Sequence, residues 1–130
     1  AAKQDHAQAQ FNLGICYHFG EGVELDYKEA VYWYKKAAKQ DYAPAQCNLG
    51  DCYYYGQGVE QDFEKAVFWY KKAAEQNFGY AQELLRNCYL LGAGVPQDNK
   101  KAKMWYDKAK ENGEEFDEEL LEKMKEAFNP

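Results

Sequence analysis

Apolar and polar positions along the chain follow the period of amphipathic helices. One face of a first helix, over about residues 7–19, collects four side chains spaced i, i+4, i+7 and i+8: Ala9, Leu13, Cys16 and Tyr17. A second helix, over about residues 27–38, shows a similar stripe: Ala30, Trp33, Tyr34 and Ala37. Together they predict a helix–turn–helix unit.

This unit occurs three times at a fixed period. Trp33, Trp69 and Trp105 lie 36 residues apart, and the same shift relates Tyr17 to its counterparts Tyr53 and Tyr89. A pair of amphipathic helices cannot bury its apolar face alone, so such units stack on their neighbours. We therefore expect an all-α, superhelical α/α solenoid of three repeats of 36 residues.

Each pair of helices is joined by a Gly-x-Gly-Val segment, at residues 20–23, 56–59 and 92–95. Two glycines suit a helix C-cap followed by a tight reversal. A phosphate-binding loop would need GxGxxG after a strand or GxxxxGK[ST], and neither occurs. Three aspartates stand where the second helices should begin and are expected to be N-caps: Asp26, Asp62 and Asp98. Glu29 would complete a capping box with the first of them.

The period divides the chain into repeats at residues 7–42, 43–78 and 79–112. Residues 1–6 align with residues 37–42 and read as the tail of a preceding repeat, as if the chain were excised from a longer array or built as one. Residues 113–130 carry an apolar stripe among acids: Phe116, Leu120, Leu121, Met124 and Phe128. They predict an acidic amphipathic capping helix in the position of a fourth first helix, with an acidic recognition tail as the alternative.

Composition and charge narrow the classes of partner. With 46% apolar and 17% aromatic residues among 130, the chain can bury a continuous core. No apolar run approaches a membrane span, and no signal peptide is visible. The net charge of −6 falls on the last twenty residues, because residues 1–110 hold equal numbers of acids and bases. A neutral array whose single arginine is Arg86 is a poor surface for nucleic acid.

The residue types disfavour catalysis. Serine and threonine are absent, which removes hydroxyl nucleophiles, the P-loop hydroxyl and N-glycosylation sites, and hints at a consensus-like or engineered origin. Cys16, Cys52 and Cys88 share one position of successive first helices and are expected to be inert packing. His18 should point away from that face, toward solvent or a partner. We expect no enzyme activity, no metal and no cofactor.

The layout resembles the Sel1-like repeat family, relatives of tetratricopeptide repeats, over about residues 7–110. The second unit carries the resemblance in Ala45-Gln46, Leu49-Gly50, Tyr53, Gly56-Gln57-Gly58-Val59, Asp62, Lys65-Ala66 and Trp69-Tyr70-Lys71-Lys72-Ala73-Ala74. The third unit departs from it at Arg86 and Lys110, which replace a glycine and an alanine. The resemblance implies a right-handed superhelix used as an adaptor in protein assemblies.

The family includes extracellular members whose repeats are stapled by paired cysteines. Here each unit has one cysteine at the repeating position, with Cys47 in addition, so the pattern for such staples is missing. Cys47 and Cys52 do not form CxxC. This favours a reducing, cytoplasmic compartment.

Positions that vary between units are the expected binding site. In related folds the first helix of each pair lines the concave side, which here presents Gln8, Asn12, Ile15, Phe19, Pro44, Asn48, Asp51, Tyr55, Tyr80, Leu84, Asn87 and Leu91. Amides would hold an extended backbone, and apolar side chains would be anchors for a peptide or partner helix. The alternative is that these side chains pack against the next unit.

A second candidate surface lies on the outer face of the second helices, at Tyr32, Phe68 and Met104. Apolar side chains there indicate a convex face for a partner or for self-association into a homo-oligomer, unless neighbouring second helices or lysine stems partly cover them. The sequence therefore predicts a non-catalytic protein-interaction scaffold. The alternative is a structural or self-assembling repeat segment, natural or engineered.

Overall fold

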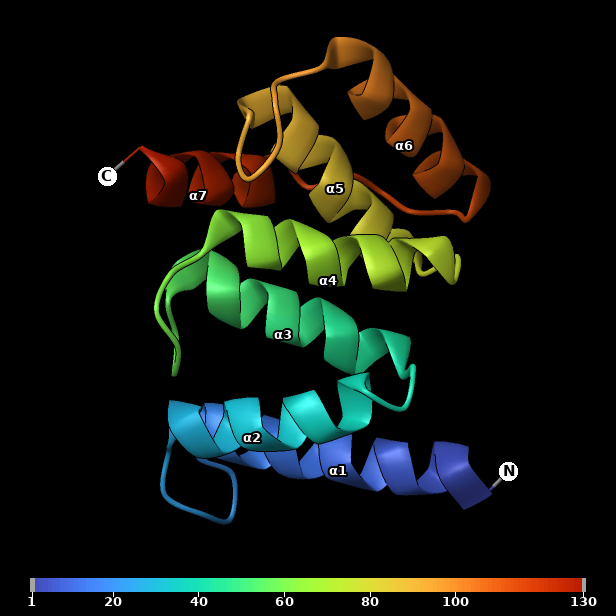
Figure 1. The fold of residues 1–130 in the computed structure, drawn as a ribbon. Helices are drawn as coiled ribbons and strands as arrows, with labels where there is room; N and C mark the ends of the chain where they lie inside the picture. Colours follow the sequence, from blue (N-terminus) through green and yellow to red (C-terminus); the bar gives the residue numbers. More distant parts are fainter. Residues whose placement is uncertain (1, 130) are drawn as a thin grey trace.

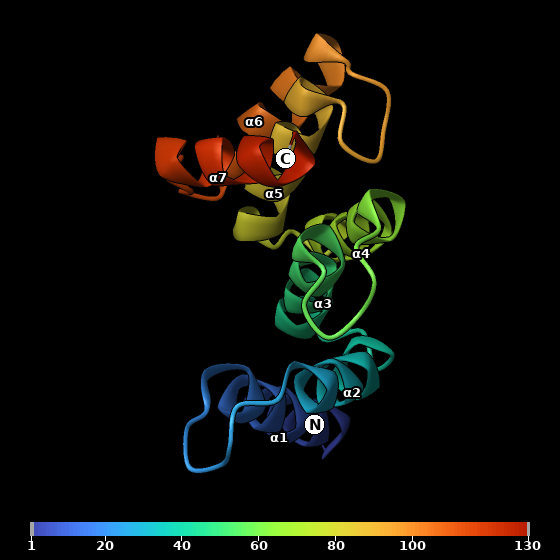
Figure 2. The ribbon, with the colours of Figure 1, turned by 90° about the vertical axis from the view of Figure 1, so that its left-hand side faces the viewer.

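The computed structural model describes residues 2–129, with side chains from His6 onward. This part of the chain is all helical, without strands, and comprises α1 (Ala2–Phe19), α2 (Tyr27–Ala38), α3 (Ala43–Tyr55), α4 (Phe63–Glu75), α5 (Gly79–Leu91), α6 (Asn99–Glu111) and α7 (Glu118–Phe128). The first six helices pack each on the next, as three pairs (Figures 1 and 2). The expected α/α solenoid of three repeats with a C-terminal helix is confirmed.

Helix α1 begins earlier than the apolar stripe predicted, at Ala2 instead of about Ala7. The corresponding backbone after α2 leaves the helix and turns before α3 begins at Ala43. The suggested repeat tail at residues 1–6 starts with Ala1, which lies outside the described residues.

The turns explain the paired glycines. Gly56 and Gly58 both adopt the left-handed conformation, with φ of 68° and 77°. A Cβ on Gly58 would also collide with the backbone carbonyl of Tyr27, and one on Gly94 with that of Phe63. The second glycine therefore lets the second and third turns pack against the preceding repeat. Gly22 has no such neighbour within 4 Å.

The three N-caps are confirmed. Asp26 Oδ1 accepts from the backbone N–H groups of Lys28 and Glu29 at 3.0 and 3.2 Å. Asp62 and Asp98 each accept one such bond at 3.1 Å. The reciprocal half of a capping box is missing, because the N–H of Asp26 donates to the carbonyl of Tyr17 instead. That backbone bond recurs in all three units and closes the turn.

The core differs from the prediction on the second helices. Trp33 and Trp69 are only half-buried, whereas Val31 and Val67, which the apolar stripe omitted, are buried. Tyr34 and Tyr70 are fully buried, since each ring lies over a glycine of the preceding helix, Gly14 or Gly50. A Cβ at either glycine would fall 2.5–2.6 Å from the ring. These Gly–Tyr contacts hold the two helices of a pair close together.

The third unit lacks this contact. Arg86 stands in the glycine position, and its guanidinium lies 5.6 Å from the ring centroid of Tyr106 and 4.8 Å from that of Phe116. Tyr106 is consequently half-buried, unlike Tyr34 and Tyr70. The departure from the repeat pattern therefore joins α6 to the segment that leads into α7.

The predicted core stripe of α1 is not buried. Ala9 and Leu13 are exposed, Leu13 by 41%, and Cys16 is half-buried. Their counterparts in α3, Ala45 and Leu49, are fully buried because α2 packs on that helix. The described chain has no helix in the corresponding place beside α1.

Helix α7 is an acidic amphipathic helix, but it is not placed as a fourth first helix. It packs mainly on α5 and does not extend the stack from α6 (Figures 1 and 2). The backbone N–H of Asp117 donates to the carboxylate of Glu83 at 2.8 Å, which fixes its start on α5. The hydroxyl of Tyr54 donates to the carbonyl of Met124 at 2.7 Å, which ties its middle to α3.

Candidate functional site

Helices α1, α3 and α5 form the surface that we call the A-helix face, and α7 lies on its C-terminal part. The sequence-predicted residues on α1 are accessible: Gln8, Asn12 and Phe19 are exposed, Phe19 by 62%, and Ile15 is half-buried. Those on α3 are all half-buried: Pro44, Asn48, Asp51 and Tyr55.

The residues on α5 fare differently. Tyr80 is exposed and Leu91 half-buried, but Leu84 and Asn87 are completely buried. The Asn87 amide donates to Met124 Sδ at 3.6 Å, and Met124 is itself fully buried. Because α7 packs here, Leu84 and Asn87 are not available to a partner in this structure. The predicted ribbon is therefore accessible along α1 and α3 and at the two ends of α5, but not in the middle of α5.

The open part contains a cavity of about 360 Å³. Six of its lining side chains come from α1, α2 and α3: His18, Phe19, Tyr34, Asn48, Asp51 and Tyr55. Gln57, Tyr80 and Lys123 complete the lining, so α5 and α7 also contribute. The cavity thus brings together five of the predicted positions with four that sequence reasoning did not assign to this site.

Three polar atoms at this cavity have no hydrogen-bond partner among the described residues: His18 Nδ1, the Tyr34 hydroxyl and the Tyr55 hydroxyl. Asn48 lies beside the Tyr34 hydroxyl without a hydrogen bond to it. Buried polar groups are normally paired, so each of these is an unmet hydrogen-bonding requirement. All three atoms belong to side chains that line this cavity, which makes it the candidate site for polar groups of a ligand.

Asp51 supplies the negative charge of the cavity. Its carboxylate accepts a hydrogen bond from the Tyr70 hydroxyl. Burial raises the pKa of Asp51 to about 6, against the opposing effects of that hydrogen bond and the charge of Lys123. Among the described side chains, the ion pair with an N–O distance within 4 Å is Lys103–Asp107, which lies on α6 and not at the cavity.

His18, which the sequence places toward solvent or a partner, lines the cavity. It is half-buried, with its ring centroid 4.6 Å from that of Phe19 and 6.1 Å from that of Tyr34. Burial lowers its pKa, which favours the neutral imidazole. The sequence indicated a place outside the core for His18, because the helical period directs this side chain away from the apolar stripe of α1. Lys123 could not be found this way, because only the tertiary position of α7 brings it here.

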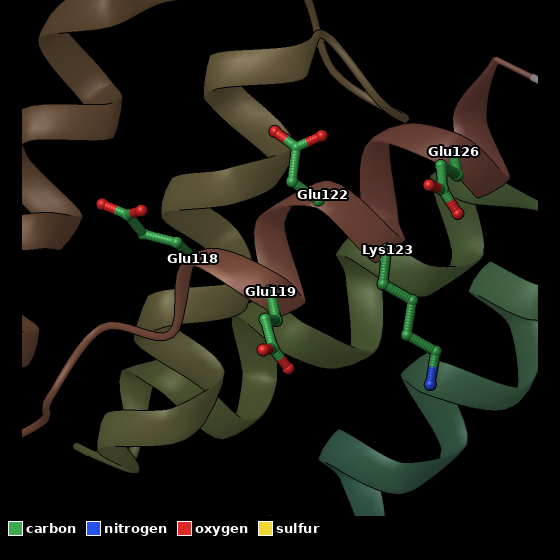
Figure 3. Close-up of a pocket in the computed structure, with 5 residues that line it drawn as sticks. All are labelled: Glu118, Glu119, Glu122, Lys123 and Glu126. Atoms are coloured by element: carbon green, nitrogen blue, oxygen red, sulfur yellow. The ribbon is translucent and has the colours of Figure 1, made fainter.

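A second hollow, of about 410 Å³, runs along α7 and is lined by that helix alone: Glu118, Glu119, Glu122, Lys123 and Glu126 (Figure 3). Walls from a single helix make a shallow surface, and none of its side-chain atoms is left buried without a partner. Figure 3 also shows Lys123 extending from α7 toward α3. We therefore place the candidate site in the A-helix cavity.

Three of the four cysteines lie in a buried, unreactive setting, and the fourth, Cys16, is a half-buried free thiol. Cys47, Cys52 and Cys88 are buried free thiols, and burial raises the pKa of each, that of Cys52 to about 12. Neutral thiols are poor nucleophiles. Within the described residues no cluster of three His, Cys, Asp or Glu side chains could hold a metal ion. No helix in that part is long and apolar enough to cross a membrane.

The outer-face residues are exposed: Tyr32 by 50%, Phe68 by 52% and Met104 by 44%. The ammonium of Lys36 lies 5.2 Å from the Tyr32 ring centroid, and that of Lys72 lies 5.6 Å from the Phe68 centroid. Lysine stems therefore cover part of this apolar surface.

Comparison with known proteins agrees with the architecture. The Sel1 repeat model matches residues 7–42, 43–78 and 79–114. The chain belongs to the Sel1 repeat family. Proteins with Sel1 repeats are generally protein–protein interaction scaffolds and typically non-catalytic. The search of curated proteins gives no match.

Solved structures share the Sel1 fold of this chain. The c5321 protein, a protective antigen present in uropathogenic Escherichia coli strains displaying an SLR fold, is 43% identical, with a TM-score of 0.83 over 87% of this chain and 24% of its own. A Sel1 repeat protein from Oxalobacter formigenes is 40% identical, with a TM-score of 0.82 over 85% and 46%. This chain therefore spans less than half the length of either.

Helicobacter pylori cysteine rich protein B is 22% identical and matches with a TM-score of 0.72, over 88% of this chain and 90% of its own. At that identity the likeness concerns the fold alone.

Proposed function

We propose that this Sel1-repeat chain is a non-catalytic scaffold that binds a peptide or helix of a partner protein on the A-helix face. The observation that carries the proposal is the cavity of about 360 Å³ between α1, α2, α3, α5 and α7. It combines apolar surface from Phe19, Tyr55 and Tyr80 with the unpartnered polar atoms described above. Apolar anchors with a few convergent polar groups are what a specific binding site requires.

The packing of α7 supports a helix or peptide as the occupant. An amphipathic segment of this chain already lies on the C-terminal part of the A-helix face, with Met124 as its buried anchor and a backbone carbonyl bonded to Tyr54. The surface thus offers both an apolar seat and a side-chain donor for a helical backbone. The part along α1 and α3 offers the same elements without a covering helix.

Peptide selection tests this proposal. A displayed library of random peptides is panned against the wild-type chain, and the affinities of the selected peptides are measured by calorimetry. Substitution of Asn48→Ala together with Tyr55→Ala should weaken binding about tenfold or more, because it removes an amide and an aromatic wall of the cavity. Tyr32→Ala, on the outer face, is the control and should leave affinity unchanged. Equal affinities for wild type and the double variant would refute the site.

The alternative function, self-association through the outer face, is supported by the exposure of Tyr32, Phe68 and Met104. The lysines over two of these rings oppose it. Self-association is tested by measuring the mass in solution of wild type and of the Tyr32→Glu, Phe68→Glu variant. An oligomeric wild type together with a monomeric variant would support self-association. A monomeric mass for both proteins would refute it.

A further inference from the structure

Asp51 is a carboxylate without a cationic partner, placed at an open cavity. It accepts a hydrogen bond from the neutral hydroxyl of Tyr70, and no lysine or arginine of the described side chains lies within 4 Å. Taking a carboxylate out of water without a counter-charge is unfavourable. No ion pair within 4 Å therefore balances the Asp51 charge in the free chain, and a cationic ligand would supply one.

The groups around Asp51 suit a cation better than an anion or an apolar group. The rings of Phe19, Tyr34, Tyr55 and Tyr80 line the same cavity, and aromatic faces attract ammonium and guanidinium groups. The hydroxyl oxygens of Tyr34 and Tyr55 are buried at this cavity without a hydrogen-bond partner, so a cationic group that reached them would gain acceptors for its N–H groups. An anion would meet the Asp51 charge, and an apolar group would leave these polar atoms unpaired.

Lys123 of α7 is an internal example of such a cation. Its ammonium lies 5.1 Å from the ring centroid of Tyr55. Figure 3 shows the side chain reaching from α7 toward α3, where Tyr55 and Asp51 lie. It remains beyond ion-pair distance of Asp51, although both side chains line the cavity.

We infer that the cavity recognises a lysine or arginine side chain of the partner, with Asp51 pairing its charge and Lys123 competing from the rim. The inference rests on the proposed function, since it names the chemistry of the segment that binds at the same site. A partner segment bound this way would present its basic side chain between α1 and α3, beside Asn48.

The test uses a peptide selected by the wild-type chain and a copy of it in which the basic residue is replaced by glutamine. Asp51→Asn keeps an oxygen for the Tyr70 hydroxyl but removes the charge. Asp51→Asn should lower the affinity for the basic peptide about tenfold or more and leave the affinity for the glutamine peptide unchanged. Lys123→Gln should raise the affinity for the basic peptide severalfold. Lys125→Gln, at an exposed position of α7 outside the cavity lining, should not. Thermal melting checks that each variant is folded.

The outcomes separate this inference from the proposed function. Selected peptides that need Asn48 and Tyr55 but carry no basic residue, or that bind Asp51→Asn as tightly as wild type, would overturn the inference and leave the A-helix site standing. If no peptide is selected, or if the selected peptides bind the Asn48→Ala, Tyr55→Ala variant as tightly as wild type, both the inference and the proposed function fail. Loss on Asp51→Asn that is equal for both peptides would show a structural effect and would also overturn it.

Discussion

At the scale of single residues, the repeat pattern predicted caps and turns well because these depend on neighbours in sequence. Asp62 caps α4 and Gly56 ends α3 in the left-handed conformation, as local rules require. Burial was predicted less well. Trp69 belongs to the most regular motif of the chain yet is half-buried, because its neighbour Tyr70 takes the space over Gly50.

The two residues should therefore differ in their effect on stability. Tyr70→Ala removes a fully buried ring and should lower the free energy of unfolding by about 3–5 kcal/mol. Trp69→Ala removes a half-buried ring and should cost less, roughly 1–3 kcal/mol. Urea denaturation of both variants measures this, and a larger loss for Trp69→Ala would contradict the core described above.

The glycines of the turns offer a matched pair. Gly22 and Gly58 share a left-handed φ, of 73° and 77°, but only Gly58 lies against the preceding repeat. Gly22→Ala should cost about 1–2 kcal/mol, the strain of that conformation. Gly58→Ala should cost more, since its Cβ would meet the Tyr27 carbonyl. Equal losses of the free energy of unfolding in the two variants would mean that the turn at Gly58 does not pack against the preceding repeat.

At the scale of helices, the 36-residue period predicted the six helices of the pairs, because each amphipathic stripe specifies its own element. It misplaced α7. A helix with an apolar stripe can pack wherever an apolar surface is open, and the choice of α5 over α6 depends on tertiary bonds from Glu83 and Tyr54. For the same reason the sequence could not show that Leu84 and Asn87 are covered.

Met124 should be the anchor of α7. Met124→Ala removes a fully buried side chain and should weaken the packing of the helix by about 2–4 kcal/mol. Hydrogen exchange should then accelerate across residues 118–128, while amides in α1 and α2 keep their protection. Met104→Ala, at a position 44% exposed, is the control. Unchanged exchange in Met124→Ala would contradict the docking of α7 on the A-helix face.

At the scale of the whole molecule, two carboxyl groups link stability to pH. Burial raises the pKa of Asp51 to about 6, opposed by Tyr70 and Lys123. Burial, with the nearby Glu114 carboxyl, raises that of Glu83 to about 7, opposed by the Asp117 N–H. Both groups bind protons more tightly in the folded chain than in the unfolded one. Their ionisation therefore lowers the free energy of unfolding as pH rises.

We expect this loss to build up between about pH 4 and pH 6 for Asp51 and between about pH 4.5 and pH 7 for Glu83, at a rate of up to about 1.4 kcal/mol per pH unit for each group. Asp51→Asn and Glu83→Gln should each flatten the dependence in the corresponding window. Denaturation series across pH measure it. A variant that retains the full wild-type slope would show that its carboxyl does not titrate with a raised pKa.

The solenoid as a whole divides into a recurring framework and a face that varies, and the sequence predicted the helices, caps and turns of the framework better than the face. The A-helix cavity needs Asn48 and Asp51 from one repeat, His18 from another and Lys123 from α7. Sequence comparison of the units identified the first two, because their positions vary on one ribbon. The cavity itself depends on how α7 folds back, which no local pattern specifies.

The central claim is that partners bind in this cavity. The most direct measurement is amide chemical-shift mapping by NMR, with the wild-type chain titrated by a peptide selected from the displayed library. The account predicts the largest shifts at His18, Asn48, Asp51 and Tyr55, with little change on the outer faces of α2, α4 and α6. Shifts concentrated at Tyr32 and Phe68, with the cavity residues unmoved, would contradict it.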